Sequence, residues 1–157
     1  MLKIREIALH SLKNRVRDAT SLVICDPYIL TSTNRQEEAE YVRELLGILP
    51  QNLANLVLVF SDTRENLGLR TILEAECPKH IKIHYLECDE IHDRVWIVNS
   101  SKAFVTGTSF NSIGYRLSFI IDLSKKDFDS FWEFLVRELG DDLKKVILEN
   151  RNNQTIS

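Results

Sequence analysis

The segment from Glu90 to Asn111, EIHDRVWIVNSSKAFVTGTSFN, contains the residues whose types and spacing are best suited to chemistry. His92 and Arg94 are separated by one residue, so in an extended segment both side chains project from the same face. A neutral imidazole can attack phosphorus and form a covalent intermediate, which divides one difficult displacement into two easier steps. A guanidinium beside it can bind two phosphate oxygens and stabilise the charge that develops in the transition state.

A second group of polar residues follows the next apolar run of the same segment. The hydroxyl of Ser109, or that of Thr108, and the amide of Asn111 can donate hydrogen bonds to the same phosphate. These interactions need neither a metal ion nor a cofactor, and we predict neither. The alternative interpretation is an ordinary buried β-hairpin, in which the histidine and arginine are hydrogen-bond and ion-pair partners and the polar residues form a turn.

Four further residues have the chemistry of zinc ligands, namely Cys77, His80, His84 and Cys88. If IKIHYLE is a strand, His84 and Cys88 lie about 13 Å apart at about 3.3 Å per residue. Ligands of one zinc ion need donor atoms within about 4 Å of one another. We therefore interpret these residues as parts of a strand and of a helix end.

The spacing of apolar residues predicts the elements that position the polar segment. In chain order these are a helix with Ile4, Ile7, Ala8, Leu12 and Val16 on its apolar face, a strand in SLVICDPYIL, a helix over 36–49, a strand in NLVLVF, a helix over 64–76 and a strand in IKIHYLE. This alternation is typical of βαβ units. Three close strands follow in RVWIVN, KAFVTG and LSFIID, and then a helix over 127–150 that is interrupted at Gly140.

The predicted fold class is therefore α/β, with a mixed, mainly parallel sheet flanked by helices in an α/β sandwich. Residues 1–150 are expected to form one domain, because 157 residues are too few for two comfortable domains. Residues 151–157 are expected to be a disordered tail.

The polar residues resemble the motif of the phospholipase D superfamily, which is His-x-Lys, four residues, Asp, then a short turn and Gly-Ser-x-Asn. The matching positions are His92-Asp93-Arg94, Asn99 after four residues, and Ser109-Phe110-Asn111 behind Gly107. The segment VICDPYI is similar to the strand and Pro-Tyr loop early in such domains, so the resemblance covers nearly the whole chain. In that family one histidine is the nucleophile, a histidine from a second copy of the motif protonates the leaving group, and lysine and asparagine bind phosphate.

The chain departs from this motif at two residues and in one spacing. Arg94 replaces the usual lysine, which retains the charge but cannot share a proton. Asn99 replaces the usual aspartate, and the spacing to Ser-x-Asn is longer by about two residues. Motifs of the His-x-Arg type resemble those of small bacterial phospholipase D-like domains, and also the C-terminal domain of MIT-domain proteins, which binds membranes.

The resemblance implies a metal-independent phosphodiesterase, with a nuclease as the expected type, that forms a phosphohistidine intermediate. Because the chain has one motif, a complete site requires a homodimer that brings two copies of His92 to one phosphate. The alternative is a catalytically inactive module that recognises a phospholipid, a nucleic acid or a protein partner. A further alternative is that the chain is one domain of a larger protein, whose other domains supply specificity.

A carboxylate is expected to orient the imidazole of His92, because it would fix the tautomer and stabilise the charged form. Asp122, at the end of LSFIID, is the first candidate. Glu90 and Asp26 are the alternatives.

The formal net charge of −3 means that an anionic partner must be bound by local basic groups. One such cluster, Lys13, Arg15 and Arg17, is interpreted as a solvated helix face in preference to a nucleic-acid patch. No apolar run approaches the roughly 18 residues of a membrane span, and the charged N-terminus is unlike a signal peptide. Three cysteines without framework spacing suggest the reducing cytoplasm, and Cys25 is interpreted as a buried packing residue.

Overall fold

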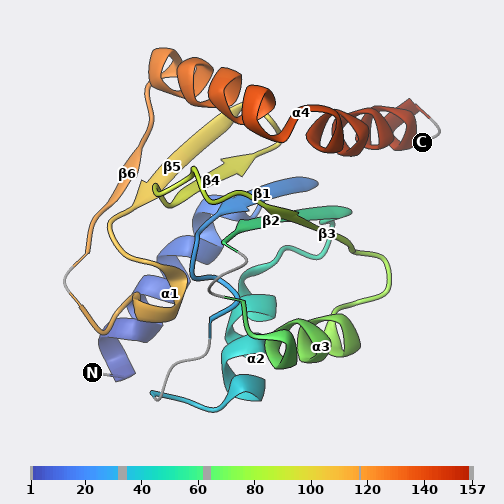
Figure 1. Cartoon of the computed structure of the whole chain (residues 1–157). Helices are drawn as coiled ribbons and strands as arrows, with labels where there is room; N and C mark the ends of the chain where they lie inside the picture. The colour runs from blue at the N-terminus through green and yellow to red at the C-terminus, as the bar shows by residue number, and fades with distance from the viewer. Residues whose placement is uncertain (1, 32–34, 62–64, 117, 156–157) are drawn as a thin grey trace.

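The computed structural model describes residues 2–31, 35–61, 65–116 and 118–155 (Figure 1). Its elements, in chain order, are α1 (Leu2–Val16), β1 (Ser21–Cys25), α2 (Glu38–Ile48), β2 (Asn55–Phe60), α3 (Leu67–Glu76), β3 (Lys82–Glu87), β4 (Val95–Val98), β5 (Lys102–Thr106), the 3-10 helix η2 (Phe110–Ser112), β6 (Ile120–Asp122) and α4 (Lys125–Thr155). Each predicted helix and strand is present. The largest difference is at β6, which comprises only the last part of the predicted LSFIID strand.

The strands form one mixed sheet in the order β3-β2-β1-β4-β5-β6. β1, β2 and β3 pair in parallel, whereas the pairs β1–β4, β4–β5 and β5–β6 are antiparallel. The predicted α/β sandwich with a mixed sheet is confirmed, but the prediction that the sheet is mainly parallel is wrong, because three of its five described strand pairs are antiparallel. Parallel pairing is confined to the βαβ half. β4 and β5 are joined by a tight turn, and such a connection permits only an antiparallel pair.

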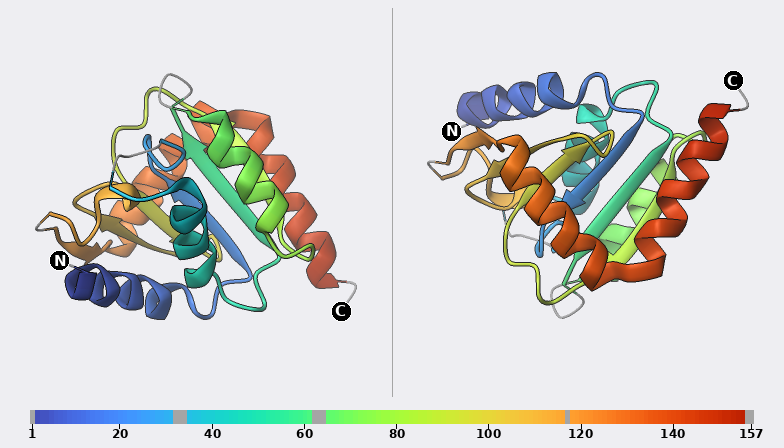
Figure 2. Two further views of the ribbon diagram at one scale, coloured as in Figure 1. Left: turned by 90° about the horizontal axis from the view of Figure 1, so that it is seen from below. Right: turned by 90° about the horizontal axis from the view of Figure 1, so that it is seen from above.

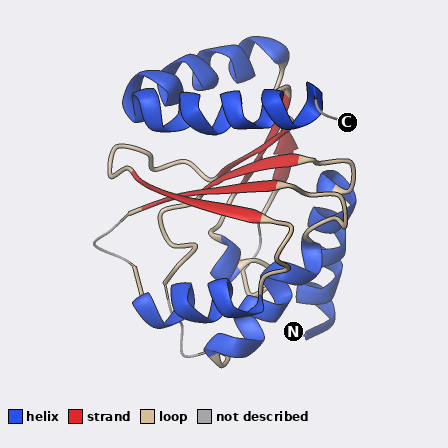
Figure 3. Cartoon of the chain, turned by 90° about the vertical axis from the view of Figure 1, so that its right-hand side faces the viewer, coloured by secondary structure: helices blue, strands red, loops and turns tan. Residues whose placement is uncertain are grey.

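Helices cover both faces of this sheet. α1, α2 and α3 lie on one face and α4 crosses the other (Figures 1 and 3). Seen from above, α4 runs obliquely over the strands, and the two ends of the chain lie on opposite sides of the molecule (Figure 2). Every residue of β2 and nearly every residue of β1 is buried, which explains their uninterrupted apolar sequences.

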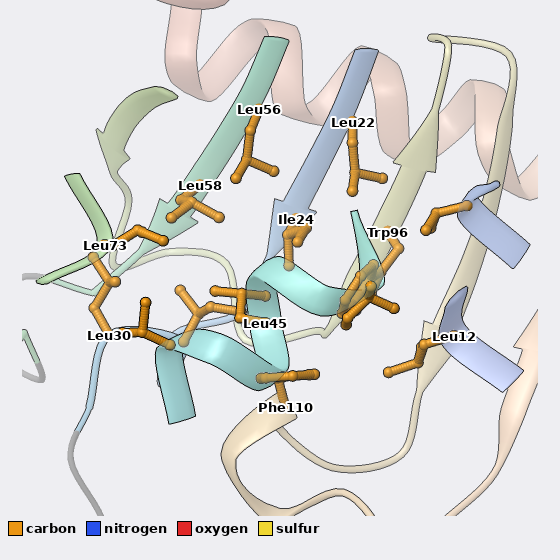
Figure 4. Close-up of a cluster of buried hydrophobic side chains, with 14 of the residues drawn as sticks. Leu12, Leu22, Ile24, Leu30, Leu45, Leu56, Leu58, Leu73, Trp96 and Phe110 are labelled. Carbon is orange, nitrogen blue, oxygen red and sulfur yellow. The ribbon is translucent and has the colours of Figure 1, made fainter. Parts of the chain in front are cut away.

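The larger hydrophobic core lies between the sheet and α1 to α3. It includes Leu45 of α2 and Trp96 of β4, together with Phe110 from the loop after β5 (Figure 4). The ring of Phe110 lies 6.2 Å from that of Trp96, between ring centres. The loop that carries the predicted phosphate-binding residues is therefore anchored in the core by its own aromatic residue.

In its first turns, the buried face of α1 differs from the predicted face. Leu12 and Val16 are fully buried as expected, but Ile4 and Ile7 are 60% and 63% exposed, whereas Arg5 is only 2% exposed. An arginine can occupy this core-facing position because its Nε forms an ion pair with Glu44 and its Nη1 donates to backbone carbonyls, whereas its Nη2 has no partner among the described residues.

α4 begins with a side-chain cap and is interrupted where the sequence predicts. The hydroxyl of Ser124 accepts a hydrogen bond from the backbone N–H of Asp127 at 3.2 Å and donates to its carboxylate at 3.0 Å. The predicted break is confirmed at Gly140, whose φ of 54° lies in the left-handed region that favours glycine. The helix then continues to Thr155, so the prediction of a disordered tail is wrong for residues 151–155, and 156–157 lie outside the described residues.

The three cysteines, Cys25, Cys77 and Cys88, are free thiols. Cys25 is fully buried, and this burial raises the pKa of its thiol far above the usual range. The interpretation of Cys25 as a packing residue is confirmed. Within the described ranges, no helix has both the length and the apolar composition that crossing a membrane would require.

Candidate functional site

The register of three strands brings the polar segments to one edge of the sheet. Cys25, the last residue of β1, lies opposite Val95, the first residue of β4, in an antiparallel pair. The next residue after β1 is Asp26 and the residue before β4 is Arg94, so these two residues lie at the same edge of the sheet. β5 pairs with the other side of β4, and the loop of residues 107–113 therefore begins beside Arg94.

Two adjoining hollows lie at this edge. The first has a volume of about 520 Å³ and is lined by Pro27, Tyr28, Ser61, Asp89, Ile91, His92 and Arg94. The second has a volume of about 400 Å³ and is lined by Tyr28, Arg35, Arg94, Gly107, Thr108, Ser109, Asn111, Ser112 and Arg116. Arg94 and Tyr28 line both hollows, so the arginine is shared between His92 on one side and the 107–113 loop on the other.

Asp26 is the buried anchor of this loop. Its carboxylate is fully buried and accepts the hydroxyl of Ser109 through both oxygens, at 2.7 and 2.8 Å. It also accepts the backbone N–H groups of Phe110 at 2.8 Å and Tyr28 at 3.0 Å. Burial raises the pKa of this carboxyl above its ordinary value, whereas these hydrogen bonds and the nearby charge of Arg94 act to lower it. Asp26 therefore ties the loop to the end of β1.

This anchor changes the role predicted for Ser109. A hydroxyl has one proton, and Ser109 donates that proton to Asp26. It cannot at the same time donate to a phosphate oxygen, and its side chain is buried. Ser109 therefore positions the loop, and its hydroxyl has no proton left to donate to a ligand.

Asn111 retains a donor for such a contact. Its Oδ1 accepts the hydroxyl of Ser112 at 3.0 Å, and its Nδ2 donates to the carbonyl of Tyr28 at 3.2 Å. These two bonds determine which way the amide is oriented. An amide nitrogen has two protons, so the second N–H of Asn111 can donate to an anion.

Arg94 has a donor that the described residues leave unsatisfied. Its Nε is buried and has no hydrogen-bond partner within the described part of the chain. The carbon of its guanidinium lies 5.7 Å from the centre of the Tyr28 ring, which helps to hold the group in place. A buried N–H without an acceptor costs free energy unless a ligand supplies one, and the natural ligand for a guanidinium is a phosphate or a carboxylate.

His92 lies in the loop before β4 and its side chain is exposed. It lines the first hollow together with Arg94, as the spacing of the two residues suggests. Asp89 lines the same hollow and accepts the hydroxyl of Ser61 at 2.7 Å. The imidazole is therefore open to a substrate from the side of the first hollow.

The structure does not bring Asp122 to these residues. Its carboxylate accepts a hydrogen bond from Arg15, and it lines a separate hollow with Lys102 and Asn99. The prediction that Asp122 orients the imidazole is wrong because β6 pairs with β5 in a register that places it opposite Phe104, away from the loop edge. Of the two alternative carboxylates, Asp26 lies at the site, and it holds the loop.

Asn99, which replaces the aspartate of the family motif, lies at the opposite end of β4 from Arg94. Its φ of 53° is left-handed, which asparagine tolerates better than most residues. Its Oδ1 accepts the backbone N–H groups of Thr20 and Ser21 at 2.8 and 3.1 Å, and its Nδ2 donates to the carbonyl of Asp18 at 3.1 Å. Asn99 therefore stabilises a turn and lines neither of the two hollows.

We expect Asn99→Ala to lower the free energy of unfolding by about 1–3 kcal/mol, because the backbone groups at the start of β1 lose their partner. Turnover per folded molecule should be unchanged. Urea unfolding followed by circular dichroism measures the first effect, and an activity assay corrected for folded fraction measures the second. A loss of turnover beyond the unfolded fraction would contradict the separation of Asn99 from the site.

Arg5, which holds the 107–113 loop, is not among the residues that the sequence predicts for the site. Its guanidinium donates to the carbonyl of Ile113 at 2.5 Å and to that of Phe110 at 3.4 Å, and it forms an ion pair with Glu44 at 2.7 Å. A signal was present, because position 5 belongs to the same helical stripe as the buried Leu12. An arginine in an apolar stripe predicts a buried ion pair or a carbonyl contact.

Comparisons with known proteins bear on the fold. No protein-family profile matches the chain, and no curated protein matches its sequence. NucT from Helicobacter pylori is similar in structure over 86% of this chain and 89% of its own, with 12% identity and a TM-score of 0.52. TrmBL2, an archaeal chromatin protein whose structure shows a novel mode of DNA binding, has 12% identity and a TM-score of 0.37, over 83% of this chain and 50% of its own. A yeast tyrosyl-DNA phosphodiesterase has 15% identity and a TM-score of 0.36, over 71% of this chain and 27% of its own.

TM-scores of 0.37 and 0.36 are too low to support an argument about this chain. The likeness to NucT extends over most of both chains and shows a shared fold at low identity. Together with the sheet order and the two helical layers, it confirms that this chain has the phospholipase D-like α/β fold predicted from its sequence.

Proposed function

We propose that the chain is a metal-independent phosphodiesterase that acts on nucleic acid through a phosphohistidine intermediate as a homodimer. The observation that carries this proposal is the first hollow, which is lined by the exposed His92 together with Arg94. The Nε of Arg94, which is buried and has no acceptor among the described residues, is a donor available for an anion. A nucleophile and a fixed cation at one solvent-accessible hollow are the elements that phosphoryl transfer requires.

In the proposed reaction, the unprotonated nitrogen of His92 attacks phosphorus while Arg94 holds the non-bridging oxygens. A nitrogen–phosphorus bond forms, the bond to the leaving oxygen breaks, and that oxygen takes a proton from a second, protonated imidazole. Water then attacks the phosphohistidine and gives a proton to the same second imidazole. This step breaks the nitrogen–phosphorus bond and restores both histidines.

The second imidazole must come from another copy of the chain. His10 is exposed on α1 and lines neither hollow. His80 hydrogen-bonds the carbonyl of Gln51 at 3.0 Å, and His84 hydrogen-bonds the residue that begins β2, at the opposite end of the sheet. In a two-fold dimer whose subunits place their first hollows face to face, each subunit contributes one His92 to a shared site.

The amide of Asn111 and the guanidinium of Arg94 are the proposed phosphate donors, with Ser109 and Asp26 as the residues that position them. Arginine in place of lysine suits this task, because its planar fork binds two oxygens at once. Since arginine cannot exchange its proton, the transfer of protons is assigned to the two histidines alone.

The proposal is tested by incubating the protein in EDTA with single- and double-stranded DNA, RNA and a chromogenic phosphodiester. Turnover in EDTA that is lost in Arg94→Ala is the expected result, and Arg94→Lys should retain a part of it because the charge remains. Binding of nucleic acid without turnover in any condition would replace the enzyme by a phosphate-recognising module. Turnover that appears only after a divalent metal is added would contradict metal independence.

A further inference from the structure

The first hollow has more lining than the proposed phosphate chemistry uses. Its volume of about 520 Å³ lies within the range of about 300–1,000 Å³ that is typical of pockets for whole small molecules. His92 and Arg94 form one part of the lining. The rest of its described lining is formed by Pro27, Tyr28, Ser61, Asp89 and Ile91. These residues are available to a part of the ligand other than the cleaved phosphate.

The ends of two neighbouring strands hold Asp89 at this hollow. β2 and β3 pair in parallel with Phe60 opposite Glu87, so Ser61 and Asp89 both follow their strands at the same edge of the sheet. The backbone N–H of Cys88 donates to the carbonyl of Phe60 at 2.9 Å, which continues the pairing beyond β3. The hydroxyl of Ser61 donates to Oδ1 of Asp89 at 2.7 Å. A carboxylate that is ordered before binding lowers the entropic cost of a ligand contact.

The carboxylate of Asp89 can accept further hydrogen bonds. A carboxylate has about four acceptor positions on its two oxygens, and the hydroxyl of Ser61 uses one of them. Asp89 is exposed, so a ligand in the hollow can reach its carboxylate. Hydrogen bonds accepted by a carboxylate are stronger than those between neutral groups.

Opposite charges in the lining restrict what the ligand can be. Arg94, which also interacts with the buried Asp26, is suited to the cleaved phosphate. Asp89 is the one acidic residue among the described residues that line this hollow. Its charge repels a second phosphate but attracts an uncharged O–H or N–H donor. The hollow therefore suits a ligand with one anionic group and, close to it, an uncharged donor.

Apolar groups complete the lining. Pro27 and Ile91 are apolar, and the ring of Tyr28 has its centre 5.7 Å from the guanidinium carbon of Arg94. Aromatic and apolar groups are surfaces against which the uncharged parts of a nucleotide pack. A nucleoside joined to the cleaved phosphate supplies both an apolar surface and hydrogen-bond donors, whereas a second phosphate supplies neither.

We propose that Asp89 accepts a hydrogen bond from the 2′-hydroxyl of the ribose bonded to the cleaved phosphate, so that RNA is preferred to DNA. This inference rests on the proposed function, which places the cleaved phosphate at His92 and Arg94. Asp89 lies three residues before His92 and lines the same hollow, and the sugar is the part of a nucleotide that adjoins its phosphate. The 2′-hydroxyl is the group by which a protein distinguishes RNA from DNA at a given position.

The first test compares cleavage of a ribodinucleotide with that of its 2′-deoxy form. Wild type is expected to have a kcat/KM about 10-fold higher for the ribodinucleotide, because a hydrogen bond to a charged acceptor is made only with that substrate. In Asp89→Ala this ratio should fall to within about 2-fold of unity. Asp93→Ala removes an exposed carboxylate that lines neither hollow, so it should leave the wild-type ratio unchanged. Equal rates on the two dinucleotides in wild type, or a preference that Asp89→Ala retains, would overturn the inference.

The second test measures binding and so does not depend on turnover. NMR titrations of His92→Ala, with and without Asp89→Ala, give the Kd for the ribodinucleotide, its 2′-deoxy form and its 2′-O-methyl form. The 2′-O-methyl form keeps the oxygen but has no proton to donate, so it should bind as weakly as the 2′-deoxy form. Loss of the 2′-hydroxyl should raise Kd about as much as Asp89→Ala does, and the two changes together should raise it no further, because they remove the same contact.

Additive losses in this cycle would overturn the ribose contact. A protein that shows the expected coupling but cleaves neither dinucleotide would refute the proposed function and leave the contact supported. Cleavage of both dinucleotides at equal rates would support the proposed function and overturn the contact.

Discussion

Replacing His92 by alanine is expected to lower kcat/KM for phosphodiesters by roughly 10⁴-fold or more, because the variant loses both the nucleophile and, in the second subunit, the acid. The fold should be unaffected, since His92 is exposed and lies outside the strands. Its free energy of unfolding should therefore remain within about 0.5 kcal/mol of wild type. Steady-state kinetics and urea unfolding of the same preparations test the two expectations together.

Mixing wild type with His92→Ala distinguishes a shared site from independent sites. If each site needs two copies of His92, random exchange in an equal mixture leaves about a quarter of the dimers intact, and activity should fall to about a quarter. If each chain acts alone, activity should fall to about half. A strictly monomeric protein in light scattering, or activity at half, would contradict the shared site.

Replacing Asp26 by alanine is expected to have the largest effect on stability among the site residues. The hydroxyl of Ser109 and the backbone N–H groups of Phe110 and Tyr28 would lose their common acceptor in a buried place. The expected loss is about 3 kcal/mol in the free energy of unfolding. Asp26→Asn keeps the shape but presents an N–H₂ group to donors, so it should recover only part of the loss.

The matched control for Asp26 is Asp122→Ala. The side chain of Asp122 is 75% exposed and takes part in a surface ion pair, a type of pair worth about 0–1 kcal/mol. Asp26→Ala should also lower kcat/KM in the folded fraction, because the loop that carries Asn111 would no longer be held, while Asp122→Ala should not. Equal effects of the two variants on stability and turnover would contradict the assignment of Asp26 as the anchor.

The stability contributed by Asp26 should depend on pH in a defined direction. Burial raises the pKa of this carboxyl in the folded chain above its value in the unfolded chain. The contribution is therefore fully present below the unfolded pKa, and it decreases as the pH rises through the folded pKa. Asp26→Asn has no titrating group at this position, so the free energy of unfolding of wild type minus that of the variant should decrease as the pH rises. Urea unfolding at a series of pH values measures this difference, and an increase would show that the folded pKa is lowered instead.

Several features of this protein follow from its sequence because they depend on residues close together along the chain. The apolar periodicity predicts each α-helix and strand, but not the 3-10 helix η2, and Gly140 predicts the break in α4, since local conformational preference and amphipathic spacing are short-range properties. His92 and Arg94 line one hollow because they are two positions apart on the same segment. The His-x-Arg and Ser-x-Asn patterns were sufficient to predict the fold.

Other features were decided only by the tertiary structure, because they depend on which distant segments become neighbours. The hydroxyl of Ser109 reaches Asp26 across 83 positions in the sequence, and the register of β1, β4 and β5 alone determines that pairing. The same register leaves Asp122 with Arg15. Hydrogen bonds and buried charges find partners among residues that are close in space. Strand pairing therefore determines which carboxylate lies at the site, and local sequence preference does not specify that pairing.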